Sequence, residues 1–166
     1  LSVASDSNLG SNTVTLAAGS TLEITGATTI DNTIALSGNA TVSNSADATL
    51  SGIISGANGL SKSGASTLTL SGSNTYSGTT TLSAGTLSVA SDANLGSGAV
   101  NLASGTTLAV TGATTIDNGI VLNGNATVSN SAKSWRACRA LRGSEIETNT
   151  CVSGMTFPAF MGCPKR

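Results

Sequence analysis

Three cysteines are the residues of this 166-residue chain best suited to metal or redox chemistry. Cys138, Cys151 and Cys163 are separated by twelve and eleven intervening residues, and the chain contains no histidine. Structural zinc sites normally combine closely spaced Cys pairs with further Cys or His ligands. The spacing therefore predicts no metal site. One disulfide with one leftover thiol stays open, with no pairing assigned.

Carboxylates offer a second kind of chemistry, but here they occur singly. Asp6 and Asp92 each stand in Ser-Asp-x-Asn-Leu-Gly, where we expect them to cap turns by accepting backbone N–H bonds. Asp31 and Asp117 each precede an asparagine and are expected at corners of the same kind. Lys62 is the only basic residue before residue 133. We therefore predict no catalytic, cofactor-binding or metal-binding residues and no enzymatic activity.

Two further motifs are interpreted as incidental. Arg136, Arg139 and Arg142 would line one side of a helix as an anion or nucleic-acid patch, but they stand beside a long anionic segment. We predict no nucleic-acid partner. Asn39-Ala-Thr41 and Asn125-Ala-Thr127 match the glycosylation sequon, which we interpret as a coincidence of composition.

The elements that would position these residues are set by an internal repeat. Leu1–Ala46 recurs as Leu87–Ala132, a spacing of 86 residues, with 35 of the 46 positions identical. A fixed internal period of this kind indicates stacked units that bury their apolar faces against one another.

Differences between the two copies indicate which side chains face inward. Thr13 and Thr15 change in the second copy, whereas Val14 and Leu16 are kept. Changes likewise fall at every second position around Ile34. Successive side chains of a strand point to opposite faces, so this alternation predicts strands with aliphatic residues inside and Thr, Ser and Asn outside.

Composition favours a narrow solenoid over a conventional two-layer core. Charged residues make up 9% of the chain and aromatic residues 2%, so single small aliphatic residues must fill the interior. A solenoid needs only about one such residue per strand and coil. If each coil holds about 20 residues and neighbouring coils lie about 4.8 Å apart, we predict that residues 1–132 form six or seven coils and a rod of about 30 Å.

One segment carries a family resemblance. Residues 59–89 read GLSKSGASTLTLSGSNTYSGTTTLSAGTLSV and resemble the autotransporter-associated β-strand repeat, also called the passenger-associated transport repeat. The shared features are the opening Gly-Leu-x-Lys-x-Gly, the Thr-Leu-Thr-Leu-Ser-Gly strand, the Asn-Thr-Tyr-Ser-Gly-Thr turn and the closing Ala-Gly-Thr-Leu.

This resemblance implies a right-handed parallel β-helix in the passenger of a Gram-negative type V secretion system, exported through the outer membrane to the cell surface. The family's role is to help the passenger cross and fold outside, while its stalk presents adhesive or virulence regions.

The implied partners are a translocator β-barrel, which we expect to be missing from this chain, and an unidentified host or cell-surface receptor or glycan. We expect no membrane-spanning segment and no cofactor. The chain begins inside a repeat unit, so we interpret it as a passenger fragment.

Two other functions stay open as alternatives. A β-helical polysaccharide-active enzyme would need clustered acids in a groove, and Asp31 is the residue to test. An ice-binding solenoid would need Thr-x-Thr motifs on one flat face. Thr13 and Thr15 fit that motif, as do Thr67 and Thr69, but the first pair becomes Ala and Asn in the copy.

Residues 133–166 continue neither the internal repeat nor its alternation of aliphatic and polar residues, and are predicted to be a divergent Cys- and Arg-containing tail. Residues 1–132 hold one lysine against six acids, a net charge of −5, and the tail holds six bases against two acids, a net charge of +4. A poorly ordered segment and a reading-frame shift both stay open. In a shifted frame the codons of Trp135–Leu141 permit Ala-Ser-Leu-Ser-Gly-Ile, close to Ala48–Ile53 of the repeat. The nucleotide sequence would distinguish the two.

Overall fold

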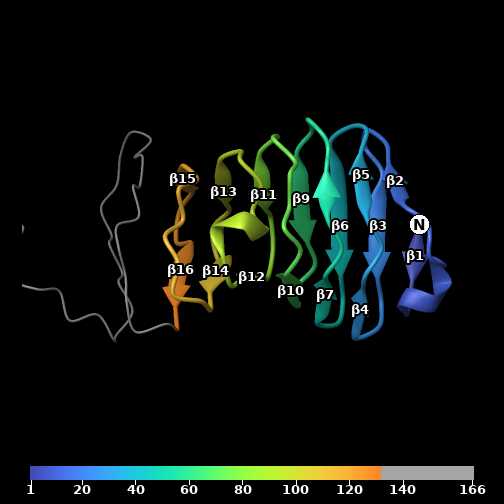
Figure 1. Cartoon of the computed structure of the whole chain (residues 1–166). Coiled ribbons are helices and arrows are strands. Elements are labelled where there is room, and N and C mark those ends of the chain that lie inside the picture. Colours follow the sequence, from blue (N-terminus) through green and yellow to red (C-terminus); the bar gives the residue numbers. More distant parts are fainter. Residues whose placement is uncertain (132–166) are drawn as a thin grey trace, which may run out of the picture.

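The computed structural model describes residues 1–131 as a stack of short parallel strands (Figure 1). Seven strands form the first sheet: β1 (Ser2–Val3), β3 (Thr21–Ile24), β6 (Ala40–Asn44), β9 (Leu60–Ser63), β11 (Thr80–Leu82), β13 (Val100–Leu102) and β15 (Ile120–Leu122). Six form the second: β4 (Thr28–Ile30), β7 (Ala48–Leu50), β10 (Thr67–Leu70), β12 (Thr86–Val89), β14 (Thr107–Val110) and β16 (Thr127–Asn130). Three form the third: β2 (Val14–Leu16), β5 (Ile34–Leu36) and β8 (Ile54–Ser55).

From β3 to β10 the chain visits the three sheets in turn, and after β10 the described strands alternate between the seven-stranded and the six-stranded sheet. Each circuit is one coil of a solenoid. Val14 pairs with Ile34 and Ile34 with Ile54, an advance of 20 residues per coil. Leu102 and Leu122 show the same advance at the other end. Every paired strand in the described residues is parallel to its neighbour. The predicted all-β solenoid of parallel strands is confirmed, and its coils hold about the 20 residues that the prediction of six or seven coils assumed.

The core consists of aliphatic residues stacked in files along the axis. Leu68, Leu87 and Leu108 occupy equivalent inward positions on neighbouring strands and are fully buried. Leu16 is buried and Val14 half-buried, whereas Thr13 and Thr15 are exposed. The alternation between the copies thus identified the inward face correctly. Strand side chains alternate between faces, and only the outer face could accept polar changes.

The two copies of the repeat occupy different faces of the solenoid. Strands β1, β3 and β6 belong to the seven-stranded sheet, but their counterparts β12, β14 and β16 belong to the six-stranded sheet. Likewise β2 and β5 lie in the three-stranded sheet, and their counterparts β13 and β15 in the seven-stranded one. Four coils of 20 residues fall six residues short of the 86-residue period, and six residues span about one strand and one corner. Each copy is therefore rotated by one face relative to the copy before it.

One large side chain in the narrow core lies against a glycine of the next coil. Tyr76 is fully buried, and Gly96 stands 20 residues after it. A Cβ added to Gly96 would collide with the Tyr76 carbonyl oxygen and would lie 3.1 Å from two carbons of the Tyr76 ring. Gly96 therefore leaves room for both the backbone and the ring of Tyr76, which a close-packed interior requires. A Cβ added to Gly56, 20 residues before Tyr76, would meet Leu36 instead.

The duplication supplies a matched test of this packing. Gly96 and its counterpart Gly10 have nearly the same left-handed φ, +65° and +63°, but nothing lies within 4 Å of a Cβ added to Gly10. We expect Gly10→Ala to lower the free energy of unfolding by about 1 kcal/mol through backbone strain alone. Gly96→Ala should cost a further 1–3 kcal/mol, roughly, because the added methyl collides with the Tyr76 carbonyl oxygen and crowds the Tyr76 ring. Urea denaturation followed by circular dichroism measures both. Equal losses would contradict the packing role.

Candidate functional site

Two of the four aspartates singled out in the sequence, Asp6 and Asp92, bind the backbone of a neighbouring coil through their carboxylates. Asp6 lies in the short 3₁₀ turn η1 (Asp6–Asn8), and its Oδ1 accepts the Asp31 N–H at 3.2 Å. In the second copy Asp92, in η2 (Asp92–Asn94), accepts the Asp117 N–H at 2.8 Å. Asp6 and Asp92 thus accept backbone N–H bonds as predicted, but the donor lies 25 residues away and not in their own turn.

Asparagines, which the sequence reasoning missed, perform the capping within each turn. Asn8 Oδ1 accepts the Ala4 and Ser5 N–H groups at 3.1 and 3.0 Å, and Asn94 Oδ1 accepts the N–H groups of Ala90 and Ser91 in the same way. The same residue, asparagine, stands at this position in both copies, and this identity was the signal in the sequence that could have revealed the capping role.

Other asparagines join successive coils at the corners. Asn32 Nδ2 donates to the carbonyl oxygens of Gly10 and Asn12, both at 2.8 Å, and Asn118 Nδ2 repeats this with Gly96 and Gly98. Two sequence blocks that are nearly identical between the copies, residues 2–10 and 25–32, are therefore bonded to each other. The side-chain N–H groups of Asn32 and Asn118 satisfy backbone carbonyl oxygens of the neighbouring coil, while their buried Oδ1 atoms have no hydrogen-bond partner among the described residues.

Lys62 is the least expected residue of the interior. It lies in β9 in the inward file between Val42 and Leu82 and is fully buried. Its Nζ donates to three backbone carbonyl oxygens: Ser63 at 2.9 Å, Gly64 at 2.6 Å and Ala84, in the next coil, at 3.2 Å. The ammonium therefore uses its three protons to join two coils at one corner.

The surroundings of Lys62 favour a structural role over a chemical one. Burial lowers the pKa of the Lys62 ammonium from its ordinary 10.5 to about 8, and the Asp47 carboxylate opposes part of this shift. A lysine with a lowered pKa can act as a base or nucleophile. Lys62, however, is closed off from solvent, so a substrate could not reach its Nζ without opening the coil.

Tyr76 forms a second buried polar link close by. Its hydroxyl is 2.7 Å from Thr80 Oγ1, and Thr80 Oγ1 lies 3.4 Å from the Leu95 carbonyl oxygen to which it donates. Burial raises the pKa of Tyr76 from 10.0 to about 12, with the Thr80 hydrogen bond acting in the opposite direction.

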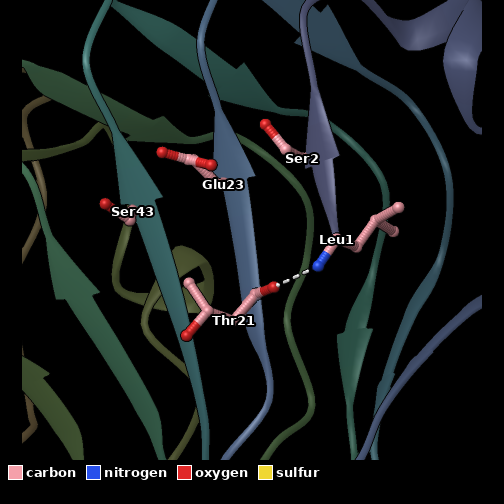
Figure 2. A pocket seen from close by; sticks show the side chains of 5 residues that line it. All are labelled: Leu1, Ser2, Thr21, Glu23 and Ser43. Atoms are coloured by element: carbon pink, nitrogen blue, oxygen red, sulfur yellow. Dashed lines mark hydrogen bonds between the residues drawn. The ribbon is translucent and has the colours of Figure 1, made fainter.

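Two shallow hollows mark the surface, and neither assembles reactive groups. Figure 2 shows one of about 200 Å³, where the Leu1 amino group donates to the Thr21 carbonyl oxygen at 3.0 Å. Glu23 is the only carboxylate side chain in its lining, and the second copy has Ala109 in its place. The other hollow, of about 340 Å³, is lined by small polar residues and glycine: Asn39, Ala57, Gly59, Ser61, Gly78, Thr79 and Thr81. An acid–base pair for hydrolysis is present in neither lining.

Within residues 1–131 no group of three or more His, Cys, Asp or Glu side chains is arranged to hold a metal ion. Among the residues that the structure describes, no helix is long and apolar enough to cross a bilayer.

Several predictions fall on residues 132–166, outside the described part of the chain. These are the boundary at residue 133, the nature of the tail, the pairing of its three cysteines and the grouping of its three arginines. They stay predictions.

Comparison with known proteins adds one finding. Residues 60–89 match the family model described as Passenger-associated-transport-repeat. This chain carries a passenger-associated transport repeat. The repeat is a structural one, it runs from β9 to β12, and it contains both Lys62 and Tyr76. The resemblance noted in the sequence is thereby confirmed. Searches of curated proteins and of solved structures found no match to the chain.

The two buried ionisable residues of the transport repeat predict how stability depends on pH. Between pH 8 and 10 the unfolded chain holds its Lys62 proton more tightly than the folded chain, so the free energy of unfolding should rise with pH. Between pH 10 and 12 the unfolded chain loses its Tyr76 proton first, so stability should fall again. We expect a maximum near pH 10, measured by urea denaturation across this range.

Substitutions separate the two contributions. In Lys62→Met the free energy of unfolding should no longer rise between pH 8 and 10 but should still fall between pH 10 and 12. In Tyr76→Phe the rise should remain and the fall should disappear. Asp47→Asn keeps the Oδ1 that accepts the Thr67 N–H but removes the charge, so the rise should begin at lower pH. A rise of unchanged size in Lys62→Met would show that another group titrates.

Proposed function

We propose that this chain is part of a cell-surface stalk: the β-helical portion of an autotransporter passenger, which helps the passenger fold outside the cell and holds other regions away from the surface. The observation that carries the proposal is the transport repeat at residues 60–89, embedded in a solenoid of uniform coils. Export to the surface, an adhesive or virulence role and assistance from a translocator barrel belong to the proposal.

The pattern of contacts supports folding during export. Each described strand pairs only with the strands of the coils before and after it, about 20 residues away in sequence. A solenoid with nearest-neighbour contacts can form coil by coil as the chain emerges, because no contact waits for a distant segment.

The rotation of the second copy relative to the first favours a spacer over a protein that binds its partner through one face. Thr21 and Thr41 of the first copy stand on the seven-stranded sheet, whereas their counterparts Thr107 and Thr127 stand on the six-stranded sheet. Any surface feature encoded in the repeat is therefore displayed on successive faces. A groove enzyme or a lattice-binding face would gain from repeats that stay on one face.

One observation favours ice binding as a second candidate. The outer face of the six-stranded sheet carries a file of four threonines in register, Thr67, Thr86, Thr107 and Thr127. The neighbouring file is mixed, however: Thr69, Ser88, Ala109 and Ser129. A flat Thr-x-Thr array is thus present on β10 and not on the strands that follow.

The stalk proposal is tested by export. Residues 1–166 placed between a signal peptide and the translocator of a well-behaved autotransporter should reach the cell surface and yield a protease-resistant core. Leu68→Asp, which buries an unpaired charge, should abolish that core because it costs several kcal/mol. Thr69→Asp changes the outward neighbour on the same strand and serves as the matched control. Resistance that is unaffected by Leu68→Asp would contradict the proposal.

The alternatives are tested on the purified chain. We expect no release of reducing ends from pectins or host glycans, and the same result for Asp31→Ala. We also expect no thermal hysteresis in the presence of ice crystals. Turnover lost in Asp31→Ala would establish the enzyme, and hysteresis lost on Thr86→Tyr would establish ice binding.

A further inference from the structure

The corner that leads into the transport repeat contains a peptide bond prone to rearrangement. An asparagine followed by glycine can deamidate without an enzyme, because glycine carries no side chain to shield its backbone nitrogen from the asparagine side chain. The chain has three such pairs, which begin at Asn58, Asn118 and Asn123. Only for Asn58 do the preceding and the following coil both lie within the described residues. This pair therefore has a described coil on each side.

The coil before the pair holds both of the groups that would react. The backbone nitrogen of Gly59, which is the nucleophile, donates its hydrogen to Asn39 Oδ1 at 2.7 Å. The side-chain amide of Asn58, which is the group attacked, donates through Nδ2 to the Leu36 carbonyl oxygen at 2.9 Å. Ring closure requires Gly59 to release its proton and the Asn58 side chain to leave Leu36. Two hydrogen bonds between coils thus oppose the reaction.

The coil after the pair closes the other side of the same peptide bond. A Cβ added to Gly78 would collide with the Asn58 carbonyl carbon and the Gly59 nitrogen, so the backbones of the two coils are in direct contact there. The next N–H along the chain, that of Leu60, donates to the Thr79 carbonyl oxygen at 3.0 Å. Closing a five-membered ring requires the backbone of the pair to rotate, and close packing between two coils resists that rotation.

We propose that Asn58–Gly59 is a deamidation site that is closed while its coil is stacked and open while the coil is unstacked. In the open state the Gly59 nitrogen loses its proton and forms a bond to Asn58 Cγ, the bond from Cγ to Nδ2 breaks, and ammonia leaves with that proton. Water then opens the succinimide ring at one of its two carbonyl groups, which yields aspartate or isoaspartate at position 58. Neither step needs an oxidant or a reductant. The proposal goes beyond the stalk function and does not depend on export.

Modification would prevent the coil from stacking again as before. Aspartate at position 58 has no N–H to donate and places a carboxylate oxygen beside the Leu36 carbonyl oxygen, so two acceptors face each other without a proton between them. Isoaspartate adds a methylene group to the main chain, which shifts the residues that follow against the register that pairs Ala40 with Leu60. The site therefore marks chains that have stayed unstacked.

Peptide mapping of the full chain by mass spectrometry tests the proposal. Deamidation at Asn58 should be at least about tenfold faster in urea than in native buffer of the same pH, because only the open population reacts. Asn39→Ala removes the acceptor of the Gly59 N–H and should raise the native rate about tenfold, the weight of one hydrogen bond near the top of its usual range. Asn39→Asp keeps an oxygen acceptor and should leave the native rate close to that of the unchanged chain.

A matched control separates local closure from general stability. Asp47 Oδ1 accepts the Thr67 N–H at 2.8 Å, which is the same kind of bond across the same spacing of 20 residues. Asp47→Ala therefore weakens a different corner and should not change the native rate at Asn58. The proposal is overturned if the native and urea rates are equal, if Asn39→Ala leaves the native rate unchanged, or if Asp47→Ala raises it as much as Asn39→Ala does.

Discussion

The whole structure depends on the parallel hydrogen-bond ladder that places each residue over the residue about 20 positions earlier. This register makes every inward side chain the neighbour of an equivalent one, so a single small aliphatic residue per strand is enough to close the core. Files such as Leu68, Leu87 and Leu108 follow from it. The same constraint explains why a chain almost without aromatic residues can bury its interior, since the coil is narrow enough for small side chains to meet across it.

Inward side chains that are not aliphatic are accommodated by groups of their own coil and of the neighbouring coils. Tyr76 lies against Gly96 of the next coil, and Lys62 uses carbonyl groups of its own coil and of the next. Asparagines at the corners do the same for backbone groups that the strands leave unpaired. An unusual side chain in a solenoid is therefore compensated partly by its own coil, as with Ser63 and Gly64 for Lys62, and partly by residues about 20 positions away. These cross-coil links also distinguish one coil from another in a sequence whose strands are otherwise much alike, which favours a unique stacking order.

The mismatch between the repeat and the coil has consequences for function. A period of 86 residues in a solenoid of 20-residue coils rotates each copy by one face, so repeated surface features spread around the rod. The acidic corners at Asp6 and Asp92 illustrate this, because equivalent residues form the same bonds on different edges. Such an arrangement suits a support that is similar on every side.

The sequence by itself determined the strands and their inward faces, because the alternation of side chains is local and the two copies recorded it. It also determined the transport repeat, whose motif is contiguous. Tertiary structure alone decided which polar groups meet. The Asp6 acceptor and its Asp31 donor are 25 residues apart, and the burial of Lys62 depends on carbonyl groups brought together by two corners. The rotation of the second copy could not be read from the sequence either, because it depends on the coil length. The 86-residue period exceeds four coils of 20 residues by six residues, and the coil length comes from the observed pairing of strands.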